Sequence, residues 1–245
     1  MRIFITLSML LCISTVNASV LLNASLNQLK NDNKLSFIGR AYDQNSGDLL
    51  YSEEHYFINS AHHSVIYREP TGQVFAKKQV IYNENQNAPE VYQVNHRNGE
   101  SINIHKKDNE YLVSYQETPD QPIKTEAIKD KEALVIDAGF NKYIQTNWQL
   151  LTANQSPSIK YLLPTRQTTI ELEIERTSCK ESNQTCFLIE PSNWFFRMLS
   201  KPLVLTYDSD SRKLMTFQGK SNISDSEGNY QEVVIHYDFS PEAAL

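Results

Sequence analysis

The sequence contains few glycines and cysteines and no motif of a common enzyme class. Its 245 residues include seven glycines and three cysteines, and they form no glycine-rich phosphate loop or dinucleotide fingerprint. A Gly-x-Ser-x-Gly nucleophile elbow is also missing, as is any cluster of Lys and Arg. With a formal net charge of −6, the chain has no general electrostatic attraction to nucleic acid. We therefore predict no cofactor, no nucleic-acid partner and no catalytic residue.

Long apolar runs are absent except at the start of the chain. Arg2 precedes the apolar run Ile3–Val16, and small residues follow up to Ala18, which is the pattern of a secretory signal peptide. The run has about fourteen residues, whereas a membrane-spanning helix needs roughly 20. We expect residues 1–18 to be cleaved. The mature chain, residues 19–245, is predicted to be one β-rich domain that is soluble in the periplasm and not an integral membrane protein.

Two of the three cysteines remain after this cleavage. Cys12 lies inside the predicted signal peptide, whereas Cys179 and Cys186 flank a polar turn between two strand-like runs. An even pair in an oxidising compartment favours a disulfide. The six intervening residues and the lack of a nearby His argue against a redox or metal motif. We predict a structural disulfide between Cys179 and Cys186.

Short alternating segments dominate the mature chain. In Ile170–Glu175 every second residue is apolar and the residues between are glutamates, which is typical of a strand with one buried face. Asn98-Gly99 lies between two such runs and predicts a tight hairpin. We predict a mainly β fold with about eleven to thirteen strands in an antiparallel meander that forms a curved or half-open barrel. Residues 116–131 lack periodicity and are predicted to be an exposed connection.

Two segments have helical rather than strand periodicity. Apolar residues recur at helical spacing in Ala138–Ala153, and a shorter helix is predicted from Ser192 or Asn193 to Ser200. We expect both helices to pack on the concave side of the sheet. Their aromatic side chains either fill a core or line an apolar cavity. The predicted lining residues are Phe140, Tyr143, Trp148, Trp194 and Phe195.

Histidines are the most conspicuous polar candidates. His62 and His63 are adjacent, so on a strand they project to opposite faces and cannot bind one ion. Glu53 and His55 share a face, and a metal bound with help from the neighbouring strand is the alternative to hydrogen-bonded or solvated side chains. We predict no metal site.

Several segments resemble an uncharacterised family of Gram-negative envelope proteins. The segments are Phe37–Asp43, Gly47–Tyr51 with Glu54-His55, Val135–Phe140, Glu190–Trp194 and Leu203–Asn222. This resemblance implies an envelope location and no particular activity. The predicted architecture is also distantly similar to the lipoprotein carriers of the LolA/LolB type, in which helices cap an unclosed barrel, but no carrier motif matches residue by residue.

Together these features favour a periplasmic protein that binds a hydrophobic ligand or a lipid-bearing partner without catalysis. The first alternative is a structural or interaction module of the cell envelope, which would need an exposed edge strand or apolar patch. The second is a hydrolase, which would need converging carboxylates or a Ser-His pair in a cleft. The sequence does not identify the ligand.

Overall fold

The computed structural model describes residues 35–129, 133–155, 157–199 and 201–240, which all belong to the unit Leu35–Leu245. The predicted signal peptide lies outside the described residues. The first half contains β1 (Phe37–Asp43), β2 (Leu49–Phe57), β3 (His62–Arg68), β4 (Val74–Ile81), β5 (Glu90–Asn95), β6 (Ser101–Lys107), β7 (Glu110–Gln116) and β8 (Lys124–Lys129). The second half contains β9 (Leu134–Val135), α2 (Gly139–Thr146), α3 (Trp148–Thr152), β10 (Ser158–Leu163), the 3₁₀ turn η1 (Pro164–Arg166), β11 (Thr168–Thr177), β12 (Gln184–Pro191), α4 (Trp194–Leu199), β13 (Leu203–Asp208), β14 (Leu214–Ser224) and β15 (Tyr230–Asp238).

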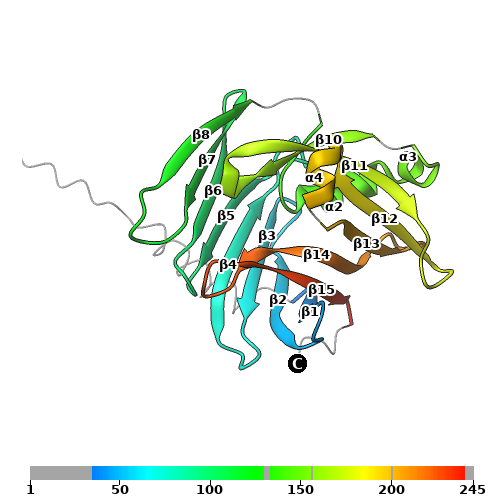
Figure 1. The fold of residues 1–245 in the computed structure, drawn as a ribbon, viewed down its shortest axis with the longest axis horizontal. Helices are drawn as coiled ribbons and strands as arrows, with labels where there is room; N and C mark the ends of the chain where they lie inside the picture. The colour runs from blue at the N-terminus through cyan, green and yellow to red at the C-terminus, as the bar shows by residue number, and fades with distance from the viewer. Residues whose placement is uncertain (1–34, 130–132, 156, 200, 241–245) are drawn as a thin grey trace, which may run out of the picture. The chain divides into compact units, whose positions relative to one another are not determined.

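The strands form a single curved sheet (Figure 1). Among the described residues the sheet has 15 strands in the order β8-β7-β6-β5-β4-β3-β2-β1-β15-β14-β13-β12-β11-β10-β9. Each strand pairs antiparallel with its sequence neighbour, except that β9 runs parallel to β10 and that β1 pairs with β15. The two outer strands, β8 and β9, do not pair with each other, so the sheet is not closed. The prediction of a mainly β, half-open antiparallel meander is confirmed.

Alternating burial explains why these segments are strands. In β11 the side chain of Ile174 is buried, whereas Glu171 and Glu175 are exposed, which is the two-residue period of a half-buried strand. In β5 the buried side chains are those of Val91, Gln93 and Asn95. Two of these three are polar, so the interior of the sheet is not uniformly apolar.

The curvature brings strands that are far apart in the sheet into contact. The amide of Asn95 on β5 donates to the backbone oxygen of Ser224 on β14 at 2.8 Å, and Gln93 donates to the oxygen of Asn222 at 3.2 Å. Three strands (β4, β3 and β2) lie between β5 and β1, and β15 and β14 follow β1 in the sheet order. These hydrogen bonds therefore cross the interior instead of following the sheet.

Glu100 strengthens the same connection. Its side chain is buried and accepts hydrogen bonds from Ser224 at 2.8 Å, from Tyr115 at 3.1 Å and from Tyr230. Burial, followed by its hydrogen bond to Glu100, raises the pKa of the Tyr230 phenol, which keeps this group a donor. We call Glu100 with these three hydroxyl groups the Glu100 clasp, because it joins the β6–β7 side of the sheet to β14 and β15.

The long helix that the sequence predicts is interrupted. Instead of one helix over Ala138–Ala153, the structure has α2 and α3, with Asn147 between them at φ −97° and ψ 17°. The Asn147 side-chain amide donates to the backbone oxygen of Tyr143 at 2.9 Å. Asn side chains compete in this way for helical backbone groups, which explains the break.

The predicted connection 116–131 contains a strand. β8 pairs with β7 from Tyr115 opposite Lys124 to Glu110 opposite Lys129. Five of its six side chains are exposed. With both faces in solvent, a strand has no reason to alternate, and so its sequence shows no period.

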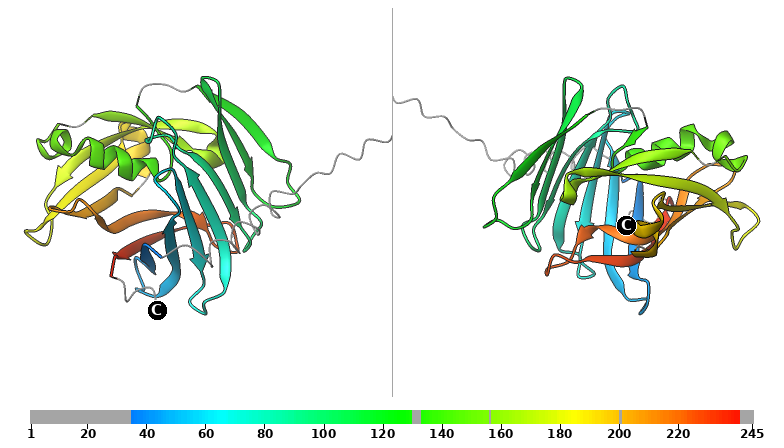
Figure 2. Two further views of the ribbon diagram at one scale, coloured as in Figure 1. Left: turned by 180° about the vertical axis from the view of Figure 1, so that it is seen from behind. Right: turned by 45° about the horizontal axis from the view of Figure 1, so that its top comes forward.

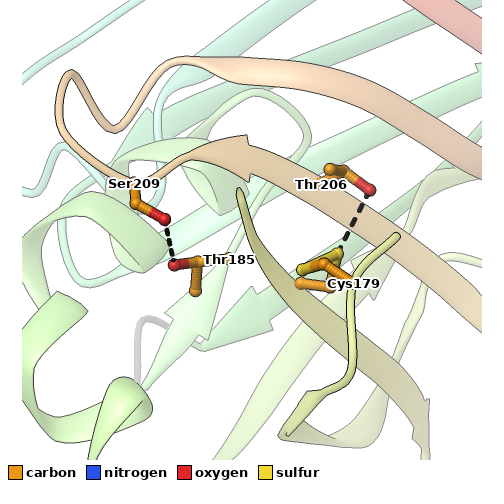
Figure 3. Close-up of a disulfide and its surroundings, with 5 residues drawn as sticks. Cys179, Thr185, Thr206 and Ser209 are labelled. Carbon is orange, nitrogen blue, oxygen red and sulfur yellow. Dashed lines mark hydrogen bonds between the residues drawn. A yellow bond between two sulfur atoms is a disulfide. The ribbon is translucent and has the colours of Figure 1, made fainter. Parts of the chain in front are cut away.

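The disulfide between Cys179 and Cys186 is present in the structure, where it bridges the hairpin that joins β11 and β12 (Figure 3). The Thr206 hydroxyl of β13 lies 3.6 Å from the Cys186 sulfur, and Thr185 and Ser209 are hydrogen-bonded at 2.9 Å. These contacts attach the bridged hairpin to the next strand.

Candidate functional site

The residues predicted to line a cavity fall into two groups. Phe140, Tyr143 and Trp148 on α2 and α3 are at most 8% exposed and belong to a packed cluster with side chains of β9 to β13. The Trp148 ring stands perpendicular to the rings of Phe187 and Tyr207 at centroid distances of 5.6 and 5.5 Å. Close aromatic packing of this kind is typical of a core. These three side chains hold the helices against the sheet.

Trp194 and Phe195 lie elsewhere, on α4. Four large apolar side chains of this helix are exposed: Trp194 is 69% exposed, Phe195 51%, Phe196 49% and Met198 72%. We call these four residues the α4 surface. A soluble protein rarely leaves such residues together in water unless they contact something.

The helices occupy opposite faces of the β10–β13 part of the sheet. In Figure 1, α4 lies in front of these strands, and in the reverse view of Figure 2, α2 and α3 lie in front of them. α2 and α3 pack on the inner face as predicted. The short helix differs from its prediction, because it lies over the face that carries Glu173 and Glu190.

Arg197 explains this orientation of α4. Its guanidinium donates to the backbone oxygen of Pro191 at 3.1 Å and to the carboxylate of Glu173 at 2.9 Å, and it lies 3.5 Å from the carboxylate of Glu190. An amphipathic helix usually buries its apolar side. Here the charged residue holds α4 to a pair of carboxylates, which leaves the aromatic side in solvent.

Two surface hollows occur away from these residues. A hollow of about 610 Å³ lies over β1 and β15 and is lined in part by Arg40, Tyr42, His236 and Asp238. A second, of about 400 Å³, lies at the disulfide-bridged hairpin. None of the five predicted lining residues borders either hollow.

A chain of buried polar side chains crosses the inner face of β2 and β3. The Glu53 carboxylate lies 3.2 Å from Nε2 of His55, and Nδ1 of His55 lies 3.0 Å from Nε2 of His63. Their exposed fractions are 4%, 8% and 6%. The β2–β3 register places His63 opposite Phe57 and thus diagonally next to His55. We call these three residues the histidine chain.

Aromatic rings cover the two imidazoles. Phe37 stacks on His55 at a centroid distance of 4.1 Å, and Phe57 stacks on His63 at 4.4 Å. The Phe57 ring is 44% exposed, so the stack reaches from the interior to the surface. The remaining nitrogen of His63, Nδ1, is buried and has no hydrogen-bond partner among the described residues. Burial, followed by the electrostatic interaction with His55, lowers the pKa of His63.

A buried ion pair lies beside the histidine chain. Nζ of Lys78 on β4 is 2.7 Å from the carboxylate of Asp137, which precedes α2. Lys78 is 3% exposed, so the carboxylate of Asp137 compensates the cost of burying its ammonium group. Asp137 has a positive φ of 44°, and its other carboxylate oxygen accepts from the backbone nitrogen of Ala138 at 2.7 Å.

These groups do not form a metal centre of the usual kind. Within the described residues, no group of three or more His, Cys, Asp or Glu side chains is arranged so that it could hold an ion. The described part of the chain contains no helix that is both long and apolar enough to cross a membrane. The shared face of Glu53 and His55 follows from the strand period. In contrast, the Lys78–Asp137 pair and the role of Arg197 have no sequence signal, because each joins residues that are distant along the chain.

The comparisons with known proteins give no family. No protein family matches the sequence, and no curated protein is significantly similar to it. Among solved structures, the chain is similar to a β-barrel-like protein of domain of unknown function DUF1849 from Brucella abortus. The TM-score is 0.46 with 7% identity over 85% of this chain and 98% of that one. At this level the comparison assigns no activity.

Proposed function

We propose that this protein is a non-catalytic binding protein that takes the acyl chains of a lipid, or of a lipid-bearing partner, on the α4 surface. The observation that carries the proposal is the orientation of α4, whose four large apolar side chains are 49–72% exposed while its arginine faces the sheet. Complete burial of such a side chain by a ligand contributes roughly 1.5–3 kcal/mol to the free energy of binding.

The charges around α4 favour an apolar ligand over a charged one. Arg197 is neutralised by Glu173 and Glu190, so the helix offers no free cation to an anionic group. The interior is a poorer place for an acyl chain, because its inner strands carry Glu53, Lys78 and Gln93 in buried positions. In this proposal Trp194 and Phe195 contact the ligand, and Phe140, Tyr143 and Trp148 support the fold.

Tryptophan fluorescence tests the proposal directly, because the chain has two tryptophans and they differ in exposure. Trp194 is 69% exposed and Trp148 is 7% exposed. Phosphatidylcholine vesicles and, separately, dodecanoic acid should shift the emission to the blue and protect Trp194 from acrylamide. The shift should be absent in Trp194→Phe, which retains Trp148.

A pair of variants separates specific contact from general adsorption. Phe195→Ser with Met198→Ser should weaken binding at least tenfold, which corresponds to about 1.4 kcal/mol. Ile123→Ser is the matched control, since Ile123 is 62% exposed and lies outside α4, and it should leave binding unchanged. Unaltered Trp194 emission with both lipids, or equal losses in the two variants, would refute the proposal.

The location in the periplasm belongs to the same proposal. A disulfide at Cys179–Cys186 persists in oxidising compartments such as the periplasm, and the N-terminal residues have the pattern of a signal peptide. Fusion of residues 1–40 to a reporter enzyme that is active only after export should give activity. An inactive fusion would contradict the location.

A further inference from the structure

The hydrogen bonds of the histidine chain limit the protons that it can carry. A carboxylate only accepts, so Nε2 of His55 carries hydrogen and donates to Glu53. One proton then lies between Nδ1 of His55 and Nε2 of His63, which are 3.0 Å apart. When neither ring carries an added proton, Nε2 of His63 carries the shared hydrogen and donates it to Nδ1 of His55. The unpartnered Nδ1 of His63 then carries no hydrogen.

One added proton is compatible with this geometry. If Nδ1 of His55 carries the shared proton, His55 is an imidazolium that donates to both Glu53 and His63, and His63 is the neutral Nδ1–H tautomer. A second added proton is not compatible. Both rings would then be imidazolium ions, and two N–H groups would face each other across 3.0 Å, which removes a hydrogen bond and places like charges in contact.

The surrounding groups do not relieve this conflict. On the inner face, β2 supplies the carboxylate of Glu53. The positive charges of Lys78 on β4 and Lys142 on α2, together with His55, act electrostatically on His63. Asp137 is engaged by Lys78 at 2.7 Å. From β15 the Tyr237 hydroxyl lies 3.5 Å from Glu53, and the phenols of Tyr51 and Tyr67 also interact electrostatically with that carboxylate.

Phe37 and Phe57, whose rings cover the two imidazoles, lie at the same end of β1 and β2. Phe37 begins β1 and Phe57 ends β2, and each stacks on one imidazole at 4.1 and 4.4 Å. Separation of the two imidazoles would therefore disturb both stacks. It would also loosen the end of the sheet where β2 turns into β3.

We propose that the histidine chain is an acid-sensitive latch: it holds this end of β1–β3 closed with at most one added proton, and a second proton opens it. The sign follows from the protonation states. An open or unfolded His63 binds a proton near its ordinary pKa of 6.5, whereas burial lowers the pKa in the closed state. Acid below about pH 6.5 therefore favours opening, and above that pH the effect is absent.

Hydrogen exchange of the full mature chain between pH 7.5 and 5 tests the latch. After correction for the intrinsic exchange rate, the opening constant of amides 55–57 and 62–64 should rise about tenfold per pH unit below 6.5, the value for uptake of one proton. The amides of β11–β13 are the internal reference and should remain protected. Equal pH dependence in the two regions would refute the proposal, because acid would then destabilise the whole fold.

Variants assign the effect to His63. His63→Gln removes the titrating ring and should abolish the pH dependence at β2 and β3. His236→Gln is the control, because His236 is exposed on β15, and it should keep the wild-type slope. A retained slope in His63→Gln would overturn the proposal. If that variant does not fold, the difference in pH dependence between the β2 and β3 amides and the β11–β13 amides of the wild-type chain still tests the proposal.

Discussion

Gly39 makes room for the interior carboxylate because it has no side chain. It lies opposite Glu53 on one side and Tyr237 on the other in the β1 registers. A Cβ at this position would lie 2.8 Å from a Tyr237 ring carbon and 3.1 Å from a Glu53 carboxylate oxygen. The first distance is shorter than van der Waals contact, so a larger residue forces the tyrosine or the strand to move.

Gly39→Ala should therefore destabilise the protein by about 1–3 kcal/mol, the usual cost of an overpacked core. Urea unfolding measures the change as a lower midpoint with an unchanged slope. Thr168→Ala, at an exposed strand position, should change stability by less than about 0.5 kcal/mol. If the two variants have equal midpoints, the packing around Gly39 is looser than the structure indicates.

Asp137→Asn tests the buried charge of Lys78 with little other change. Asn tolerates the positive φ of this position and keeps an oxygen for the backbone nitrogen of Ala138, so the main loss is the negative charge 2.7 Å from Lys78. Removing one member of a buried pair costs about 3–5 kcal/mol. Thermal unfolding at pH 7 should show this loss.

Lys78→Met in the same chain is the compensating change. The double variant should be more stable than Asp137→Asn alone, because no buried charge is left without a partner. Additive losses in the double variant would contradict the role assigned to this pair.

The elements differ in how well the sequence predicts them. Strands with one buried face, such as Ile170–Glu175, are readable because burial imposes the alternation. The sequence predicts a connection at β8, because both faces of this strand are exposed and its residues therefore show no alternation. The aromatic pattern of α4 indicates a helix, but it does not show which side of the helix faces water. The orientation depends on Glu173 and Glu190, which lie on β11 and β12. The strand period places Glu53 and His55 on one face, whereas their contact with His63 follows only from the β2–β3 register.

The disulfide should stabilise the hairpin between β11 and β12. The sequence separation of its two cysteines is 7, and a loop of this size contributes on the order of 2–3 kcal/mol by restricting the unfolded chain. Cys179→Ser with Cys186→Ser should lower the free energy of unfolding by this amount in urea. Dithiothreitol should lower the stability of the wild type similarly and leave the double variant unchanged.

The Glu100 clasp joins strands that the sheet order keeps apart, so its effect should extend over the whole unit. Glu100→Gln keeps the size but removes the charge that accepts from three hydroxyl groups. Hydrogen bonds to charged groups are worth about 1.5–3 kcal/mol each. We expect this substitution to lower the free energy of unfolding, measured in urea, by at least about 2 kcal/mol.

The loss should appear equally by far-ultraviolet circular dichroism and by tryptophan fluorescence, because one cooperative unit unfolds. Ser114→Ala is a suitable comparison, since the Ser114 hydroxyl is hydrogen-bonded to that of Thr125 on the exposed outer side at 2.8 Å and the loss of this bond should be small. Two separate transitions in Glu100→Gln would show that the halves of the sheet unfold independently.

The strand order has a consequence for the folding rate. Only the β1–β15 pair joins residues from opposite ends of the described chain, for example Ile38 with Asp238, and such distant contacts slow folding. In a circular permutant, the chain is cut between Lys129 and Leu134, and a short linker joins Ser240 to the start of β1. This permutant would begin with β9 and end with β8. Every neighbouring strand pair in it would be consecutive in sequence. We expect this permutant to keep the same fold and to refold faster in stopped-flow experiments.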